Sequence, residues 1–316
     1  MLALAASILF HVSIPVDTWT DPVGTDADDP AIVYRGSNSL ILGTDKTEAP
    51  NGGLAVFNLN GKKIGGVTGL DRPNNVDVVQ RFKIGKRNVT LAVVTERAAN
   101  QLRIFEVTQS GKLVDLTGST KLSRDGKAIL PMGVATYQAK NTNFVTITPK
   151  EASGPGQCLV GTLKFNSETN KVDFQEREWK GPFSGKKETE SVAIEPKTGT
   201  TFYSDEGHGV WKIRLNQEPK LIANPLHTGD HEGLAFLNGK LISTDQRKEN
   251  TYFWAYDLQT SKLLGSFSLG TDETDGIDIC ARPMGTKFPK GIMVAMNSKG
   301  KNFAIVDVRK ISNALK

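Results

Sequence analysis

The chain has very little cysteine: among its 316 residues, Cys158 and Cys280 are the two thiols. They fall in the third and sixth copies of an internal repeat described below, and a closed ring of six repeats places those copies on opposite sides. Bridged cysteines have Cα atoms within about 7 Å of each other. We therefore expect no disulfide between them.

Long hydrophobic runs are absent too, since no segment offers the roughly 20 apolar residues that a membrane helix needs. Residues 1–14 are apolar enough to resemble the hydrophobic part of a signal peptide, but they lack a basic start and a clear small-residue cleavage site. We interpret residues 1–10 as a signal-peptide remnant or a disordered N-terminus, and residues 11–316 as one domain. The expected location is secreted or periplasmic.

Signatures of the common catalytic classes are also missing. The sequence has no Gly-x-Ser-x-Gly elbow, Walker loop, or Gly-x-Gly-x-x-Gly motif between a strand and a helix. The formal net charge of +5 is modest and spread along the chain, which favours small anions over nucleic acid as partners. We expect a monomer that binds neither nucleic acid nor membranes.

What the chain has instead is one short phrase written six times, in which the residue ahead of a short apolar run is acidic in four copies, Asn in one and Met in one. The copies occupy residues 29–33, 75–79, 132–136, 190–194, 232–236 and 275–279. Successive copies begin 46, 57, 58, 42 and 43 positions apart. A period of roughly 40–50 residues, with each copy opening a group of short strands, is typical of a propeller blade. Six copies predict an all-β fold, a six-bladed β-propeller.

Short strands separated by Gly, Asn and Asp turns fill out each repeat, and no long helical period appears. The first five repeats each predict four strands, whereas the sixth predicts three. Residues 10–16 alternate like a strand but precede the first repeat. We expect this N-terminal strand to complete the sixth blade and close the ring, because an unpaired outer edge would leave backbone groups open.

A second repeated position ends the second strand of each blade, for example at residues 44–46, 95–97 and 204–206. In antiparallel neighbours, the end of the second strand lies beside the start of the first. The polar residues of both positions should therefore share one rim around the axis. The expected cations come from the first three blades: Lys46, Arg97 and Lys150. The expected acids come from the first blade and the last three: Asp28, Asp29, Glu190, Glu206, Asp230, Glu232 and Asp275.

Carboxylates crowded on one rim raise one another's pKa, and a divalent cation relieves this repulsion. Calcium takes roughly six to eight oxygen ligands in loose geometry. Lys and Arg beside such ions hold an anion, and Arg grips a phosphate through two parallel bonds. The rim thus predicts a site for a polyanion together with several calcium ions.

Each feature also has a simpler structural interpretation. An acid before Gly is commonly a turn residue, and a single Lys or Arg is commonly a solvated loop charge. For His231, beside Glu232, a structural role has more weight than a role as a base. The acids and cations recur at equivalent positions in several blades, and this recurrence favours a functional role for them.

The ordered phrases resemble those of the β-propeller phytases, the calcium-dependent alkaline phytases. The matching segments span nearly the whole chain in the family's order: 28–32, 74–77, 189–190, 232–234, 274–278 and 302–303. The resemblance implies a 3-phytase-type phosphatase that hydrolyses phytate, myo-inositol hexakisphosphate, to lower inositol phosphates. It also implies that phytate is taken as its calcium complex and that calcium is both structural and catalytic.

The resemblance further implies roles for individual residues. Catalytic roles fall on Lys46, Arg97, Glu190 and Glu206, and substrate contacts on Lys46, Arg97 and Lys150. Metal ligands, with the valine acting through its carbonyl, are Asp28, Asp29, Asn74, Val76, Glu190, Glu206, Asp230, Glu232, Gln246, Asp275 and Asn302. The sequence departs from the family pattern at Met132, a substrate position where the family commonly places Tyr. Arg247 is the candidate substrate contact that compensates.

On this hypothesis no protein nucleophile is needed. Calcium neutralises the phosphates and activates a water that attacks phosphorus, while Lys46 and Arg97 stabilise the developing charge. Two alternatives remain open. A calcium-dependent lactonase-like hydrolase is disfavoured by three cations beside the acids, and a propeller that binds its ligand without catalysis is not excluded by the sequence.

Overall fold

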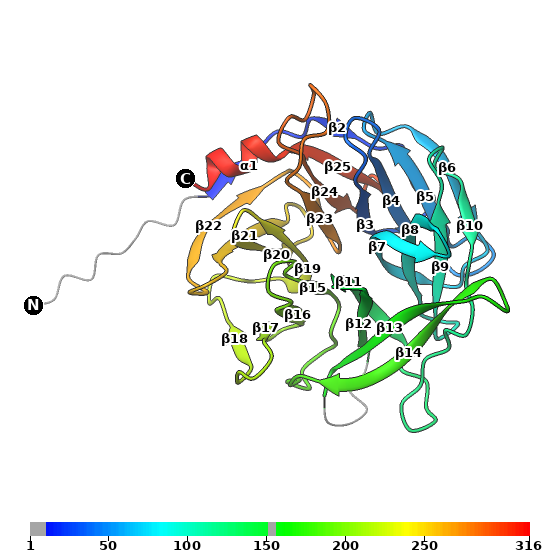
Figure 1. The fold of residues 1–316 in the computed structure, drawn as a ribbon. Helices are drawn as coiled ribbons and strands as arrows, with labels where there is room; N and C mark the ends of the chain where they lie inside the picture. Colours follow the sequence, from blue (N-terminus) through cyan, green and yellow to red (C-terminus); the bar gives the residue numbers. More distant parts are fainter. Residues whose placement is uncertain (1–10, 151–155) are drawn as a thin grey trace, which may run out of the picture.

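The computed structural model describes residues 11–150 and 156–316. The predicted signal-peptide remnant or disordered N-terminus, residues 1–10, lies outside these ranges. Within them, six sheets surround a common axis (Figure 1), and the secondary structure is almost entirely β. The prediction of a six-bladed β-propeller is confirmed.

Each sheet forms one blade, and its strands follow chain order from the axis outward. The first blade contains β3 (Ala27–Val33), β4 (Leu40–Asp45), β5 (Gly53–Asn58) and β6 (Lys63–Thr68). The second contains β7 (Pro73–Ile84), β8 (Arg87–Glu96), β9 (Gln101–Val107) and β10 (Leu113–Asp115). The third contains β11 (Pro131–Ala139), β12 (Thr142–Pro149), β13 (Cys158–Asn166) and β14 (Lys171–Lys180).

The second half of the ring repeats the plan. The fourth blade contains β15 (Val192–Ile194), β16 (Thr201–Asp205), β17 (Gly209–Ile213) and β18 (Lys220–Ile222). The fifth contains β19 (Asp230–Leu237), β20 (Lys240–Gln246), β21 (Tyr252–Asp257) and β22 (Leu263–Ser268). The sixth contains β23 (Ile277–Cys280), β24 (Ile292–Asn297) and β25 (Asn302–Asp307). The innermost strands of neighbouring blades contact one another around the axis.

The N-terminus adds two outer strands, and they correct one detail of the sequence analysis. β1 (His11–Ser13) pairs parallel with β22 and so extends the fifth blade. β2 (Thr18–Trp19) pairs antiparallel with β25 and completes the sixth. An N-terminal strand therefore closes the ring, as predicted, but the closing residues follow the predicted segment 10–16.

A short C-terminal helix, α1 (Val308–Ala314), was not expected from the sequence. Its N-cap residue Asp307 accepts a hydrogen bond from the backbone N of Arg309 at 2.8 Å. Ile311 is fully buried in the cluster between the fifth and sixth blades. Within the described ranges, no helix is both long and apolar enough to cross a membrane. Both cysteines are free, as predicted.

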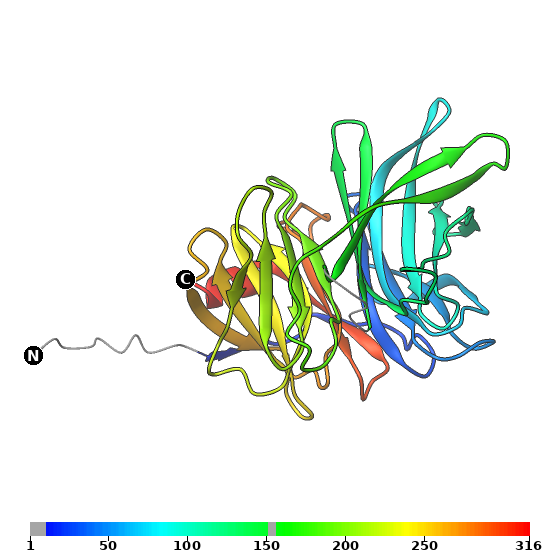
Figure 2. The same cartoon turned by 90° about the horizontal axis from the view of Figure 1, so that it is seen from below.

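Apolar side chains fill the spaces between adjacent blades. One cluster joins the second and third blades, with Val93 and Ile147 completely buried, and similar clusters join other neighbours. Figure 2 shows that the long hairpins of these two blades, in cyan and green, extend beyond the rest of the ring on one side. The core is therefore a series of apolar layers between neighbouring sheets.

The inner strands are irregular where the repeated polar phrase occurs. The register shifts between Ala27 and Pro30, and equivalent shifts occur in β7, β11 and β19. A bulge bends its strand and re-aims the side chains at the extra residue. In four of the six blades, the repeated phrase thus lies at a β-bulge near the start of the inner strand.

Two glycines of the repeated phrase let neighbouring inner strands touch. The backbone N of Gly276 donates to the carbonyl of Asp28 at 3.0 Å, and that of Gly233 donates to the carbonyl of Asp275 at 2.7 Å. A Cβ atom on Gly276 would lie 2.6 Å from the Cα of Asp29. The adjacent blade leaves no room for a side chain after the acid. This close approach requires glycine, in addition to any preference of a turn for glycine.

We expect Gly276→Ala to destabilise the fold by roughly 1–3 kcal/mol, the usual cost of overpacking. The backbone of Asp29 would have to move away from the new methyl group, which would open the contact between the sixth and first blades. Denaturant unfolding of the variant and the parent protein measures the change.

Gly65→Ala is the matched control, because a Cβ atom there meets no atom nearer than the carbonyl oxygen of Gly111 at 3.6 Å. Its expected effect lies within about 0.5 kcal/mol, as for most surface substitutions. Equal stability losses in the two variants would remove the close-approach explanation.

Candidate metal and phosphate site

A hydroxyl group at the end of the second strand fastens the bulged start of the inner strand. Thr44 Oγ1 accepts a hydrogen bond from the backbone N of Asp29 at 2.9 Å and donates to the carbonyl of Asn74, in the next blade, at 2.7 Å. Thr95 makes both contacts one blade further on, at 2.9 and 2.6 Å. These threonines are therefore structural, whereas their neighbours in the phrase carry the charges.

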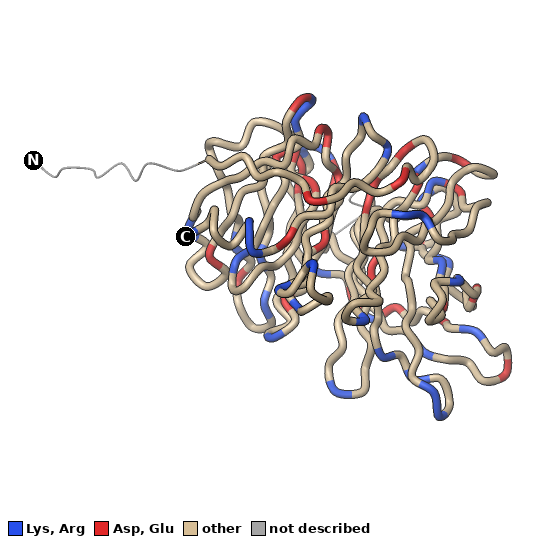
Figure 3. Tube along the Cα trace, turned by 90° about the horizontal axis from the view of Figure 1, so that it is seen from above, with Lys and Arg blue, Asp and Glu red and all other residues tan. Residues whose placement is uncertain are grey.

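The charged residues of the repeat meet at one end of the axis. A small cavity there is lined by polar side chains from five blades: Asp28, Asn74, Glu190, Glu232 and Asp275. All five were expected as metal ligands, and the structure brings them together. Figure 3 shows that acidic and basic segments are interspersed over the molecule as a whole, so this local concentration of acids does not follow from overall composition.

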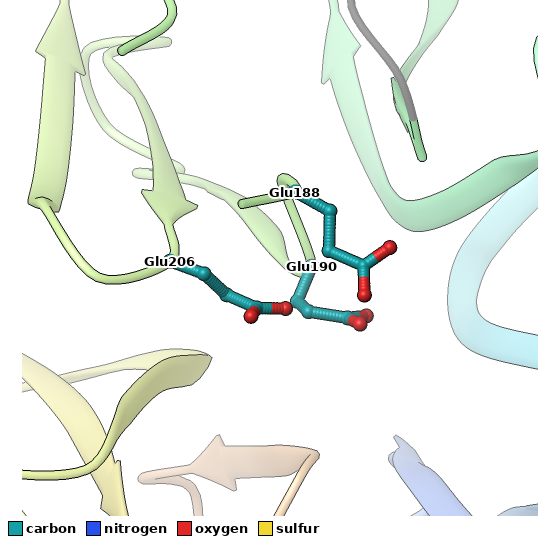
Figure 4. Close-up of side chains that lie close together, drawn as sticks. All are labelled: Glu188, Glu190 and Glu206. Carbon is teal, nitrogen blue, oxygen red and sulfur yellow. The ribbon is translucent and has the colours of Figure 1, made fainter. Parts of the chain in front are cut away.

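Two groups of carboxylates offer closely spaced oxygen atoms. The oxygens of Glu188, Glu190 and Glu206 lie within 4.8 Å of one another, and so do those of Glu206, Asp230 and Glu232. Figure 4 shows the first group, in which the Glu190 carboxylate lies just below that of Glu188 and the Glu206 side chain points toward Glu190. Glu206 belongs to both groups, which form one continuous acidic surface.

The electrostatic cost of this arrangement appears in the pKa values of its acids. Burial raises the pKa of Glu190 and of Glu232 well above the ordinary value, and neighbouring carboxylates raise it further. The pKa of Asp275 is also raised, mainly by burial. The folded protein therefore favours either protons or cations at this rim.

Part of the compensating charge comes from Lys46. Its Nζ donates to Asp28 Oδ1 and to Asp275 Oδ2, the latter at 3.1 Å. Burial opposes the ammonium charge, but Asp28 and Asp275 outweigh it and raise the pKa of Lys46 well above the ordinary value. Gln246 also donates to Asp275. The predicted phosphate contact Lys46 thus lies among the acids.

The donor set fits a hard divalent cation such as calcium. Asn74 Oδ1 is buried with no hydrogen-bond partner, and an unpaired buried acceptor is costly unless something satisfies it. Carboxylate and amide oxygens surround the cavity, which is the ligand chemistry that calcium prefers. The acidic clusters and the orphaned amide oxygen are therefore compatible with metal binding.

The other predicted cations lie on the blades expected for them. Lys150 pairs with Glu188 and keeps 36% of its side chain exposed. Arg97 donates through Nη1 to the sulfur of Met132 at 3.1 Å. Met132 is only 1% exposed, so its side chain packs beneath Arg97, and a buried thioether gives a phosphate no hydrogen-bond donor.

Several predicted site residues lie apart from the central acids. Arg247 is held by Asp245, at 2.5 Å from Nη2, and by the Tyr252 ring, whose centroid lies 3.8 Å away. Asn302 donates to the carbonyl of Thr20 at 3.2 Å. Within the described residues, no hydrogen bond or ion pair links Arg247 or Asn302 to the central acids. Arg247 is therefore poorly placed to replace a donor at position 132.

Asp29 and Val76 meet, but through a different contact from the expected one. The backbone N of Val76 donates to Asp29 Oδ2 at 2.9 Å. One oxygen of this predicted metal ligand therefore bridges the first and second blades. Burial raises the pKa of Asp29 well above its ordinary value, and this hydrogen bond opposes the shift.

Two charged residues of the site were missed by the sequence analysis. Glu188 and Lys187 belong to the loop between β14 and β15 and lie outside both repeated positions. Glu188 completes the first acidic cluster, and Lys187 contacts the second. The available signal was the run of charges at 186–188, just ahead of the fourth repeated phrase.

Comparison with known proteins agrees with this geometry. The phytase family model matches residues 2–316. The chain belongs to the phytase family. The resemblance predicted from the sequence is confirmed, and with it the enzyme class, a phytate-hydrolysing phosphatase. A 3-phytase of Bacillus subtilis (strain 168) is 27% identical over 349 aligned positions, which cover 96% of this chain and 86% of the relative.

Solved structures support the fold alone. The α-L-arabinofuranosidase Arb93A of Fusarium graminearum has a TM-score of 0.61 at 12% identity, covering 94% of this chain and 98% of the other. Sqt1 of Saccharomyces cerevisiae has a TM-score of 0.54 at 9% identity, covering 94% and 99%. Such distant likeness indicates a shared propeller architecture and carries no functional argument.

The metal-free phytase is expected to be more stable in mild acid than at alkaline pH. Because the pKa values of Glu190, Glu232 and Asp275 are raised in the folded state, folding takes up protons above about pH 4.5. The stabilisation is complete below the unfolded pKa values and is lost as the pH rises through the folded ones. Thermal unfolding in chelator at about pH 5.5 and about pH 8 should give the higher Tm at the lower pH.

Glu232→Gln is the control: groups elsewhere also titrate, but this substitution removes only the contribution of one rim carboxylate and leaves those other groups in place. The variant should show a smaller difference between the two pH values. Saturating calcium should raise the Tm of the parent protein most at alkaline pH, where the acids are ionised. A parent Tm that responds to neither pH nor calcium would contradict the electrostatic account.

Proposed function

We propose that this phytase is a calcium-dependent phosphomonoesterase that releases phosphate from phytate by attack of water, without a protein nucleophile. The observation that carries the proposal is the convergence of two clusters of carboxylate oxygens, each within 4.8 Å, at the rim that also holds Lys46 and Arg97. A polyanionic substrate needs positive charge, whereas the chain supplies a surplus of acids. The polyanion and the acids become compatible through divalent cations shared between them.

The residues divide into ion-holding and phosphate-holding groups. Asp28, Glu190, Glu206, Glu232 and Asp275 would hold calcium, together with Asn74 Oδ1. When bound, calcium supplies positive charge against the phosphates and makes water more acidic. The carboxylates would orient the attacking water by accepting hydrogen bonds from it, and the ring of blades holds them in place before the substrate arrives.

The cations act on the phosphate directly. Arg97 is anchored by one guanidinium nitrogen on the Met132 sulfur and keeps other donors for the equatorial oxygens of the reacting phosphate. Lys46, fixed between Asp28 and Asp275, adds positive charge where negative charge develops. Lys150, at the third blade, is available for a neighbouring phosphate. Inositol phosphates with adjacent phosphates should therefore be preferred over isolated monoesters.

The deciding measurement is phosphate release from phytate at neutral to alkaline pH, with calcium and then with chelator. Release that falls to the background on chelation and returns with added calcium supports the proposal. Binding of phytate without release would indicate a non-catalytic propeller, and hydrolysis of lactones in place of phytate would indicate the lactonase-like alternative. Release that is insensitive to chelation would overturn the role of the metal.

Two substitutions should separate metal ligands from phosphate ligands. Glu232→Gln keeps the shape of the side chain but removes a charge, so the variant should need more calcium to reach half of its maximal activity. Arg97→Met should lower kcat by roughly ten- to a hundredfold, the worth of one charged hydrogen bond, and should leave the calcium requirement unchanged. Calcium titrations of phosphate release measure both effects.

Arg87→Met is the control for loss of a guanidinium group. Arg87 opens β8 at the tip of a hairpin, its side chain is 64% exposed, and its partner is Glu106 at 3.3 Å. The kcat and the calcium requirement of Arg87→Met should equal those of the parent protein. If Arg97→Met and Glu232→Gln shift the calcium requirement equally, the division into two groups of ligands is wrong.

A further inference from the structure

Lys187 occupies a position between two carboxylates of the second acidic cluster. Its Nζ lies 3.2 Å from Glu206 Oε2 and 2.7 Å from Asp230 Oδ2. These two acids, with Glu232, form a group whose oxygens all lie within 4.8 Å of one another. A single ammonium group thus contacts two of the three carboxylates that could hold a divalent cation.

The ammonium is the loosely held member of this contact. The side chain of Lys187 is 49% exposed, whereas Glu206 is 5% exposed and Asp230 is 33% exposed. A lysine has a flexible four-carbon stem and a strongly hydrated head group, so it reaches the acids from solvent and returns there without moving the backbone. The carboxylates, by contrast, are fixed on β19 and on the turn after β16.

Lys187 differs in this respect from the other lysines of the rim. Lys46 is 21% exposed and bridges Asp28 to Asp275, neither of which belongs to a three-acid cluster. Lys150 contacts a single cluster acid, Glu188. Among the described residues, Lys187 is the lysine whose ion pairs join two acids of the same cluster.

We infer that Lys187 is a tethered counter-ion, which holds Glu206 and Asp230 together in the metal-free protein and is displaced when a divalent cation binds them. The inference rests on the proposed metal dependence and adds a function for a residue outside the repeated positions. It has two consequences of opposite sign. Lys187 stabilises the metal-free fold, because it screens two acids that would repel each other, and it weakens ion binding, because the ion must first break its contacts.

The test compares Lys187→Met with the parent protein in two measurements that need no substrate. In chelator, the Tm of Lys187→Met should be lower than that of the parent. In calorimetric titration with calcium alone, the variant should bind more tightly at one class of site, by roughly three- to tenfold, the range that two partly exposed ion pairs supply. A merely structural lysine would lower the Tm without tightening calcium binding.

Lys186→Met is the matched control, since Lys186 is the exposed neighbour and its Nζ lies 3.4 Å from the carbonyl oxygen of Gly207. It should change neither measurement. If Lys187→Met does not fold without metal, Lys187→Arg provides a second test. This substitution keeps the charge on a head group suited to carboxylates, so calcium should bind no more tightly than to the parent.

The outcomes separate this inference from the proposed function. Equal calcium affinity in Lys187→Met and the parent, with calcium still required for phosphate release, overturns the inference and leaves the function intact. Tighter binding to Lys187→Arg than to the parent also overturns it. Failure of the parent itself to bind calcium overturns both.

Discussion

The inner strand of each blade is a sheet edge without a further strand beside it, and the whole ring depends on how these six edges are satisfied. Several of them find partners on the adjacent blade. Asp278 Oδ2 accepts from the backbone N of Ile32 at 2.7 Å, and Asp77 Oδ2 accepts from that of Thr136 at 2.5 Å. Together with the threonine and glycine contacts nearer the rim, these bonds join the fifth blade to the sixth, the sixth to the first, the first to the second and the second to the third. Unpaired edge groups in the body of a domain would be costly.

The same crowding creates the chemistry at the rim. Inner strands that touch bring Glu190, Glu232 and Asp275 together around one small cavity with Asp28, so acids that are far apart in the sequence share one small space. Their repulsion is relieved in different ways at different places. Lys46 provides a buried ammonium, Lys150 and Lys187 reach in from loops, and Asn74 presents an oxygen that has no partner. Preorganised oxygens of this kind bind cations without reorganisation, because the fold already holds the ligands together.

The position beneath Arg97 shows how the ring adapts to a changed residue. Met132 fills this position with an apolar side chain and offers its sulfur to the guanidinium group. The arginine is thereby packed and oriented, although nothing at position 132 is able to donate to a phosphate. Arg247 lies on the fifth blade, where Asp245 and Tyr252 hold it. On the proposed function, the phosphate contacts at this part of the rim would be made by Arg97, which follows β8 of the second blade, and by Lys150, which follows β12 of the third.

The sequence by itself determined the number of blades and most of the acidic rim. The repeated phrase predicts six inner strands, and antiparallel pairing requires that the ends of the second strands lie beside them, so Lys46, Glu190 and Glu232 were predictable as neighbours. Short alternating segments do not specify which edge they join. Consequently only the tertiary structure shows that β2, and not the segment before it, completes the sixth blade.

The partners of long side chains were likewise decided by the tertiary structure. Lys46 appeared from its spacing to be a free phosphate contact, yet its ammonium lies between Asp28 and Asp275. Glu188 and Lys187 lie in a loop whose sequence is not part of the repeated pattern. The position of such a loop depends on the blades on either side of it. A repeated pattern specifies where a backbone position falls on the ring. The partner that a flexible side chain finds there depends on distances between blades, and these are set only when the ring closes.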